Sequence, residues 1–206
     1  MPKRIKLSAG KAVYDSIADA VKALKNCDYK LIGIAGGSCS GKTYLAKFLA
    51  EKLHGSCLSM DDYYIGRSRM KDDNFDHPDA VDLKLWGVHI KSVKEGKAIK
   101  RPSYNFVTHE REAPRSWKPF FPVITEGLFT LLKPHADNLD LKIFIEADSA
   151  MRLSRRIFRD TALRGRMHDD IADQWRRCVE KMHNQYVAPQ RDAADIIIYN
   201  NEAAKI

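Results

Sequence analysis

The sequence has 206 residues, with 35 lysine and arginine residues against 27 aspartate and glutamate residues, and therefore a formal net charge of +8. Hydrophobic residues make up 44% of the chain and are spread along it, which predicts one globular domain over residues 1–206. No stretch approaches the roughly 18 consecutive apolar residues of a membrane-spanning helix, which excludes a transmembrane protein. Residues 1–8 carry charge with no apolar run after them, so we expect no secretory signal and a cytoplasmic location.

The four cysteines and the positive charge narrow the class of ligand only in part. Cys27, Cys39, Cys57 and Cys178 form no C-x-x-C pair and have no metal-ligand spacing. We therefore expect reduced, mostly buried thiols rather than a zinc site or a disulfide framework. The excess of lysine and arginine is compatible with nucleic acid, an acidic membrane surface or small phosphate-bearing ligands, and net charge does not choose among them.

Hydrophobic periodicity predicts helices that alternate with short strands. In the first half we expect a helix over residues 9–26, a strand over 31–35, a helix after the following glycine-rich turn, a strand over 56–60 and a helix over about 79–95. Residues 97–118 alternate polar residues with tyrosine, phenylalanine, valine and proline, which is typical of an irregular hairpin.

The alternation continues in the second half. We expect strands over 121–125, 141–145 and 196–199, an arginine-bearing helix from Asp148 to Gly165, and a second helix over about 169–187. Five strands interleaved with helices predict an α/β fold of three layers around a mainly parallel sheet. The hairpin would be a lobe inserted into this single domain.

The strongest motif lies between the strand over 31–35 and the next helix. Residues 36–43 match the phosphate-loop pattern G-x-x-x-x-G-K-[ST] in the strand-loop-helix context that the pattern requires. Backbone N–H groups and the helix N-terminus would hold phosphates, Lys42 would reach the β and γ phosphates, and the Thr43 hydroxyl would bind Mg²⁺. The expected nucleotide-binding residues are Gly36, Gly37, Ser38, Cys39, Ser40, Gly41, Lys42, Thr43 and Tyr44.

A phosphate loop does not name the reaction, because GTPases, motor ATPases and small-molecule kinases share it. The sequence contains neither the N-K-x-D guanine signature nor the D-x-x-G switch, which argues against a GTPase. A chain of 206 residues leaves little room for a motor beyond one nucleotide domain. These observations favour a small kinase.

Two acidic residues follow predicted strands. Asp61 comes directly after residues 56–60, and Glu126 comes after residues 123–125. Ligands of open α/β sheets bind beyond the carboxyl ends of the strands. A carboxylate there can hold Mg²⁺, usually through its waters, or accept a proton from an attacking hydroxyl. The plain alternatives are a solvated turn acid or helix cap for Asp61 and a helix cap for Glu126.

Several segments together resemble the uridine kinase branch of the phosphoribulokinase/uridine kinase family, from about residue 31 to 198. Besides the phosphate loop they are DDYY at 61–64, NFDHPDA at 74–80, PSYNF at 102–106, His109, Arg111, Glu126-Gly127, Arg155-Arg156, Arg159-Asp160, Arg164-Gly165-Arg166, Gln174 and Ala194-Asp195. The resemblance implies a P-loop kinase fold, ATP or GTP with Mg²⁺, and phosphorylation of the 5′-hydroxyl of uridine or cytidine in pyrimidine salvage. It also implies a homo-oligomer.

The resemblance also implies a role for each matching residue. The catalytic residues would be Asp61, as general base for the ribose hydroxyl, with Lys42 and Arg159. Arg164 would bind the nucleotide, and the metal would be attended by Thr43, Glu126 and Asp61. Residues 160–172 would form a lid over the phosphates. The nucleoside-binding residues would be Asp76 and Arg156 on the ribose diol, with Tyr64, Phe75, Tyr104, His109, Arg166 and Gln174.

Plain structural roles stay open for some of these residues. Arg152, Arg156 and Arg159 share one face of their predicted helix, which also fits a solvated basic face. Phe75 and Tyr104 are compatible with the core of the hairpin, and His109 with an exposed position.

The sequence departs from the family pattern at three places. Cys39 stands where glycine is more usual, which should be harmless if its φ is negative. Asn105 replaces a common aspartate, so the nucleoside lobe would lack one charge. After residues 196–199 the sequence lacks the segment with Gly and Asp that usually follows, which puts the pocket for the donor base in doubt.

Other functions are also compatible with the sequence. A kinase for ribulose 5-phosphate, pantothenate or nicotinamide riboside would use the same chemistry, although the NFDHPDA segment favours a pyrimidine nucleoside. A nucleic-acid-binding ATPase would explain the basic charge, but the sequence lacks an RNA-binding signature and an aromatic ladder. A nucleotide-gated binding module would not need Asp61. We therefore expect a small nucleoside as partner, with neither nucleic acid nor a membrane.

Overall fold

The computed structural model describes residues 11–24, 28–70 and 72–201. Its main sheet has six strands in the order β1-β8-β7-β2-β6-β3, and every neighbouring pair is parallel. The strands are β1 (Ala12–Tyr14), β2 (Leu31–Gly36), β3 (Ser56–Ser59), β6 (Val123–Glu126), β7 (Leu141–Glu146) and β8 (Ile196–Tyr199). The predicted α/β architecture is confirmed, with one strand more than expected.

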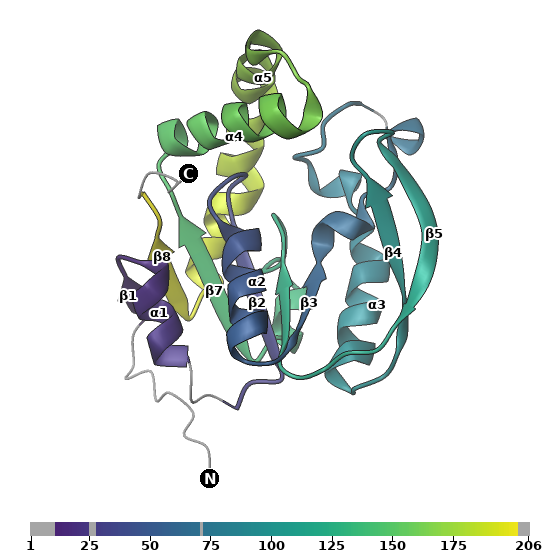
Figure 1. Ribbon diagram of the computed structural model, residues 1–206, viewed down its shortest axis with the longest axis vertical. Helices are drawn as coiled ribbons and strands as arrows, with labels where there is room; N and C mark the ends of the chain where they lie inside the picture. The colour runs from purple at the N-terminus through teal and green to yellow at the C-terminus, as the bar shows by residue number, and fades with distance from the viewer. Residues whose placement is uncertain (1–10, 25–27, 71, 202–206) are drawn as a thin grey trace.

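The additional strand is β1, at the edge of the sheet (Figure 1). The predicted helix over 9–26 is wrong for residues 12–14, which pair with Ile196, Ile197 and Ile198 of β8. The helix α1 (Ile17–Leu24) begins later, where the Ser16 hydroxyl accepts a hydrogen bond from the Asp19 N–H at 3.2 Å. The open edge of β8 supplies the backbone partners that favour a strand before this cap. Residues 9, 10, 25 and 26 lie outside the described residues.

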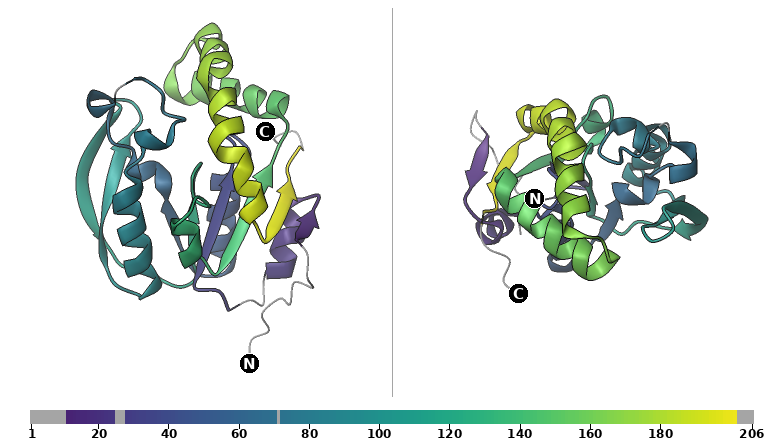
Figure 2. Two further views of the ribbon diagram at one scale, coloured as in Figure 1. Left: turned by 180° about the vertical axis from the view of Figure 1, so that it is seen from behind. Right: turned by 90° about the horizontal axis from the view of Figure 1, so that it is seen from above.

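Helices cover both faces of the sheet (Figures 1 and 2). On one face, α1 and α2 (Lys42–Lys52) pack on the inward side chains of β2, β7 and β8, among them Ile34, Ile143 and Ile196. On the other face, α3 (Leu83–Lys94) and the C-terminal helical segment pack on Leu31, Phe144 and their neighbours. The near-continuous apolar runs in the strands follow from this burial on both faces.

The C-terminal third is mostly helical. The predicted arginine-bearing helix is α4 (Ser149–Arg164), which ends at Gly165 with a φ of +62°. The predicted helix over 169–187 is present as α5 (His168–Gln174), a π-helix (Trp175–Val179), α6 (Glu180–Met182) and a second π-helix (His183–Val187), followed by a 3₁₀ helix (Ala188–Ala193). In the described part of the chain, no helix has the length and apolar character needed to cross a membrane.

The predicted hairpin is confirmed as β4 (Ile99–Asn105) and β5 (Glu110–Trp117), an antiparallel pair beside α3 (Figure 1). Short 3₁₀ helices lie at Met60–Tyr63, Arg67–Arg69, Pro78–Ala80 and His135–Asn138. Two arginines attach the lobe to the segment after β3. The Arg101 guanidinium donates to Asp62 at 2.7 Å, and Arg111 donates to the carbonyls of Tyr63 and Tyr64 at 2.7 and 2.6 Å. These bonds fix the lobe relative to the sheet.

Candidate active site

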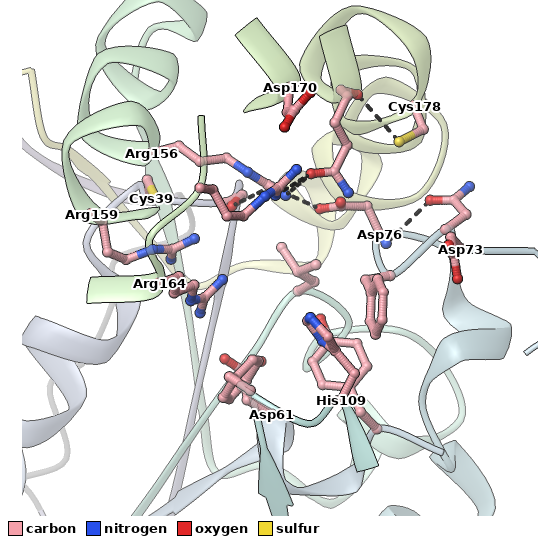
Figure 3. A pocket seen from close by; sticks show the side chains of 18 of the residues that line it. Cys39, Asp61, Asp73, Asp76, His109, Arg156, Arg159, Arg164, Asp170 and Cys178 are labelled. Atoms are coloured by element: carbon pink, nitrogen blue, oxygen red, sulfur yellow. Dashed lines mark hydrogen bonds and ion pairs between the residues drawn. The ribbon is translucent and has the colours of Figure 1, made fainter. Parts of the chain in front are cut away.

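A cavity of about 810 Å³ lies beyond the carboxyl ends of β2, β3 and β6 (Figure 3). Its size is in the range of pockets for small molecules. The loop after β2, the segment after β3, residues 72–76, the hairpin tip, α4 and α5 enclose it. It brings together most of the predicted residues: Ser38, Cys39, Gly41, Lys42, Thr43, Tyr44, Asp61, Tyr64, Phe75, Asp76, His109, Glu126, Arg156, Arg159, Arg164, Arg166 and Gln174.

Asn200, which follows β8, binds the backbone of the phosphate loop. Its Nδ2 donates to the Ser40 carbonyl at 2.8 Å, and a Cβ at Gly41 would lie 2.5 Å from the same nitrogen. Gly41 has a φ of +108°, so glycine is required there on both grounds. Gly36, Gly37 and Ser40 form the backbone of the loop rather than the wall of the cavity.

Lys42 begins α2 at the floor of the cavity, and its Nζ donates to the Gly37 carbonyl at 2.8 Å. Burial lowers the pKa of Lys42, although the charges of Glu126 and Asp61 act in the opposite direction. Among the described residues, no carboxylate lies within ion-pair distance of this ammonium. A buried cation without a paired anion is a suitable partner for a phosphate.

Cys39 has a φ of +60°, which contradicts the expectation of a negative value. The loop turns here, so a residue with a Cβ occupies the left-handed region that glycine enters freely. Its carbonyl accepts a hydrogen bond from Arg155 at 3.4 Å. Cys39, Cys57 and Cys178 are free and half-buried rather than mostly buried, and Cys27 lies outside the described residues.

Glu126 is the last residue of β6 and is only 1% exposed. Its carboxylate accepts hydrogen bonds from the Thr43 hydroxyl at 3.2 Å and the Ser59 hydroxyl at 2.5 Å. It is therefore held by side chains of α2 and β3 and is not a helix cap. Ser59 also accepts a hydrogen bond from the Asp61 N–H at 3.3 Å, so one serine links both acidic residues.

Asp61 is half-buried and lines the cavity from the 3₁₀ helix after β3 (Figure 3). Burial raises the pKa of Asp61 to about 7, and the charge of Glu126 adds to the shift, while Lys42, Arg159 and Arg164 oppose it. A carboxylate with this pKa is an efficient general base near neutral pH. This environment is not that of a solvated turn acid.

The side-chain oxygen atoms of Thr43, Asp61 and Glu126 are ligands of the kind that Mg²⁺ prefers. In the described part of the chain, no group of three or more His, Cys, Asp or Glu side chains is arranged to hold a metal ion. Mg²⁺ is usually held by one or two carboxylates together with substrate phosphates and water, so a hydroxyl with two carboxylates beside a phosphate loop suits it.

Four arginines converge on Asp160, which is 0% exposed. Arg156, Arg159 and Arg164 come from α4, and Arg166 follows Gly165. Their distances to the carboxylate of Asp160 are 3.6, 2.7, 3.3 and 3.8 Å in that order. In Figure 3, Arg159 and Arg164 point into the cavity on one side, while Arg156 reaches toward Asp76.

Arg152 lies one turn before Arg156 and is 2% exposed. Its guanidinium lies over the Trp175 ring at 5.1 Å and is 3.1 Å from Glu180, and a Cβ at Gly37 would lie 2.8 Å from its Nη1. The shared helix face predicted for Arg152, Arg156 and Arg159 thus faces the phosphate loop. A solvated basic face is wrong for Arg152 and Arg156.

Aromatic side chains line another part of the cavity wall. The centre of the Phe75 ring lies 5.9 Å from the centre of the Tyr64 ring and 5.2 Å from that of His109. Burial lowers the pKa of His109, and the charge of Arg67 lowers it further. The Nδ1 atom of His109 is buried and has no hydrogen-bond partner. Tyr104 packs behind Tyr64 at 5.3 Å and does not line the cavity, so its place is in the hairpin core.

Asp76 and Arg156 lie together, as the resemblance implies, with 3.6 Å between Oδ1 and Nη1. Arg156 also donates to Ser38 Oγ at 3.0 Å and to Gln174 Oε1 at 3.1 Å, and Arg166 donates to the same Gln174 oxygen at 2.7 Å. Asp76 Oδ2 is buried without a hydrogen-bond partner. A ligand hydroxyl would satisfy this acceptor.

Residues 31–206 match the sequence profile of the Phosphoribulokinase / Uridine kinase family. This chain belongs to that family. It is 37% identical to uridine kinases of Staphylococcus aureus strains JH9 and Newman over 186 residues, which cover 85% of this chain and 90% of each relative. The chain is therefore a nucleoside kinase, and its cavity contains the phosphate loop together with Asp61 and Glu126.

Solved structures confirm the fold of this family member. A putative fructose transport system kinase from Silicibacter sp. TM1040 aligns with a TM-score of 0.71, at 18% identity, over 88% of this chain and 98% of its own. A possible uridine kinase from Bacillus stearothermophilus aligns with a TM-score of 0.63, at 18% identity, over 88% and 96% of the two chains. These likenesses support the α/β P-loop kinase architecture.

Some residues of the site escaped the sequence analysis. Ser59 ends β3 with no motif of its own. Phe106 was predicted only as part of the PSYNF motif, without a role in the site; it lines the cavity from the hairpin tip, and the Arg164 guanidinium lies 4.7 Å from its ring centre. Asp160 was recognised only as part of a motif, because nothing local shows that a helical aspartate is buried. The position of each residue depends on contacts between distant segments.

The Asn105 departure has a local explanation. Its side-chain oxygen accepts hydrogen bonds from the N–H groups of Val107 and Thr108 at 2.8 and 3.1 Å, which forms the turn at the hairpin tip. Asn105 does not line the cavity, so the charge that the lobe lacks at this position would not line it either. At the end of β8, Asn200 and Asn201 bind the phosphate loop and the Asp148 N–H, while residues 202–206 lie outside the described residues.

Proposed function

We propose that this kinase transfers the γ-phosphate of ATP to the 5′-hydroxyl of uridine or cytidine. One observation carries the proposal: a single cavity contains the phosphate loop with Lys42, the half-buried Asp61, and the Asp76–Arg156 pair with its unsatisfied acceptor. The 37% identity to uridine kinases over most of both chains supports the choice of nucleoside.

Asp61 would accept the proton of the 5′-hydroxyl as its oxygen bonds to the γ-phosphorus. The bond from that phosphorus to the β–γ bridging oxygen breaks, and ADP leaves with the bonding electron pair. The raised pKa of Asp61 suits it to this transfer near neutral pH. Lys42, Arg159 and Arg164 would stabilise the charge on the phosphate oxygens, since their positive charges already act on the nearby Asp61 carboxylate.

Thr43, Glu126 and Asp61 would hold Mg²⁺. When bound, the ion neutralises phosphate charge during the transfer. Ser59 orients the Glu126 carboxylate for this role through its 2.5 Å hydrogen bond.

The acceptor side would recognise a ribose and a single ring. Asp76 and Arg156 offer an acceptor and donors to the two vicinal hydroxyls. Tyr64, Phe75 and His109 would enclose the base, and the unpaired His109 Nδ1 is available to its polar edge. The lid role of residues 160–172 belongs to this proposal, with Arg164 and Arg166 on either side of Gly165.

A direct test measures the initial rate of phosphorylation with ATP or GTP as donor, and with uridine, cytidine, adenosine, nicotinamide riboside, pantothenate and ribulose 5-phosphate as acceptors. We expect uridine and cytidine to give the highest kcat/KM. A preference for one of the other acceptors would overturn the substrate assignment. Light scattering of the same preparation tests the predicted homo-oligomer.

A further inference from the structure

We propose that Asp160 is a positioning residue that links the nucleotide side of the cavity to the nucleoside side, so that each ligand tightens the binding of the other. The inference rests on the proposed function, and Asp160 itself does not line the cavity. It concerns how this chain orders four arginines around one buried carboxylate.

The two oxygens of Asp160 lie near different pairs of arginines. Oδ1 lies 2.7 Å from Arg159 Nε and 3.3 Å from Arg164 Nη1. Oδ2 lies 3.6 Å from Arg156 Nε and 3.8 Å from Arg166 Nη1; these are ion-pair contacts, since Oδ2 has no hydrogen-bond partner. One carboxylate therefore contacts both pairs at once.

The arginines around Asp160 reach both parts of the cavity. Arg159 and Arg164 act on the charge of Asp61, beside the phosphate loop. Arg156 and Arg166 both donate to Gln174, and Arg156 also contacts Asp76, on the nucleoside side. Arg156 in addition donates to Ser38 Oγ of the phosphate loop at 3.0 Å, and Arg164 lies 4.7 Å from the Phe106 ring centre at the hairpin tip. The Asp160 carboxylate therefore contacts guanidinium groups that together reach both sides of the cavity.

The backbone of Asp160 strengthens the link. Its carbonyl accepts hydrogen bonds from the N–H groups of Gly165 and Arg166, the latter at 3.1 Å. The side chain and the carbonyl of one residue therefore hold both sides of the turn between α4 and α5. Arg164 and Arg166 cannot reorient independently while these contacts persist.

Charge explains why the carboxylate is needed. Burial acts to raise the pKa of Asp160, but its hydrogen bond with Arg159 and the nearby guanidinium charges prevail and hold it below its ordinary value. Without the negative charge, four guanidinium groups would repel one another around a buried position. They would separate, and each ligand would have to order its own arginines.

The link predicts positive coupling. Phosphates that fix Arg159 and Arg164 also fix the Asp160 carboxylate, which then keeps Arg156 and Arg166 in place for the nucleoside. The free-energy cost of ordering the lid is therefore smaller when the second ligand binds. Coupling of this kind is typically about 5- to 150-fold in affinity and must be equal in both directions.

The test is calorimetric titration of uridine into the protein, with and without a saturating non-hydrolysable ATP analogue and Mg²⁺. We expect the analogue to tighten uridine binding at least about fivefold in the wild type, and less than about twofold in Asp160→Asn. Asp192→Asn is the matched control, because this aspartate is 89% exposed and pairs with Lys11 away from the cavity. It should keep the wild-type coupling.

Wild-type coupling retained in Asp160→Asn, or no coupling in the wild type, would overturn the inference. A wild-type protein that binds neither uridine nor the analogue would instead refute the proposed function, and this linkage with it. A loss of stability alone would not produce the expected result, because the measured quantity is a ratio of two affinities in one folded protein.

A second set of variants applies if circular dichroism shows that Asp160→Asn does not fold. Arg164→Gln and Arg166→Gln alter guanidinium groups held by different oxygens of Asp160. With the analogue bound, independent effects on uridine affinity would multiply within about twofold in the double variant. A deviation above about threefold would support the link, and simple multiplication would refute it.

Discussion

Replacing Asp61 by asparagine should stabilise the fold above neutral pH while it removes most of the activity. Burial and the charge of Glu126 raise the pKa of this carboxyl from 3.8 to about 7. An acid whose pKa is raised on folding binds its proton more tightly in the folded state. Ionisation of Asp61 therefore lowers the free energy of unfolding. This loss grows from about pH 4 to pH 7 and then stays constant.

The magnitude follows from the pKa. A shift of about three units corresponds to at most about 4 kcal/mol, since each unit is about 1.4 kcal/mol. Asp61 is only half-buried and borders an open cavity, so solvent screening reduces this to about 1–2 kcal/mol. For a chain of 206 residues, this corresponds to a rise in Tm of about 2–8 °C.

Thermal unfolding of the wild type and Asp61→Asn should be measured from pH 4 to pH 8. We expect the variant to gain Tm at pH 8 and to gain almost nothing near pH 4. Its kcat should fall about 10²-fold or more, with uridine affinity nearly unchanged, because asparagine cannot accept the proton. The wild-type kcat/KM should in turn fall about tenfold between pH 8 and pH 6, as Asp61 of the free enzyme becomes protonated.

Asp62→Asn is the control, since it makes the same chemical change at the next residue. Asp62 is paired with Arg101 at 2.5 Å, so its loss should lower Tm and leave the pH profile of kcat/KM in place. A Tm of Asp61→Asn that is unchanged or lower at pH 8 would refute the burial argument. Lost uridine binding with kcat intact would make Asp61 a binding residue.

Three further predictions concern the loop and the ribose. Lys42→Ala should abolish phosphoryl transfer and weaken nucleotide binding, because the phosphates lose a buried ammonium; wild-type affinity in calorimetry would contradict this. Cys39→Gly should raise Tm by about 2–4 °C, because glycine adopts a φ of +60° without a Cβ clash; a lower Tm would show that the cysteine is not strained. 2′-Deoxyuridine should have a kcat/KM about 5- to 150-fold below that of uridine, since a group of the Asp76–Arg156 pair stays unpaired; equal rates would exclude the diol contact.

The sequence predicted those parts of the protein that short segments specify. The phosphate loop was predictable because its glycines, Lys42 and Thr43 are consecutive, and because an apolar strand precedes them. Asp61 and Glu126 were predictable because parallel strands end at the same edge of a sheet. The hairpin and the end of α4 at Gly165 also depend on local residues, and the structure has both.

Other predictions failed or were incomplete because the deciding contacts join distant segments. Residues 12–14 form a strand only because the edge of β8, more than 180 residues later, offers backbone partners. The spacing of hydrophobic residues before α1 does not contain that information. Tyr104 belongs to a motif that resembles part of a nucleoside site, yet it packs against Tyr64 and does not line the cavity.

By itself the sequence determined that the chain forms an α/β kinase domain with a phosphate loop, because hydrophobic period, turn residues and motif spacing are properties of neighbouring residues. Only the tertiary structure decided the strand order, the φ of Cys39 and the burial of Asp160 among four arginines. Burial and pKa depend on which side chains and solvent surround a group in space, and chain packing brings those neighbours together from α4, α5 and the loops.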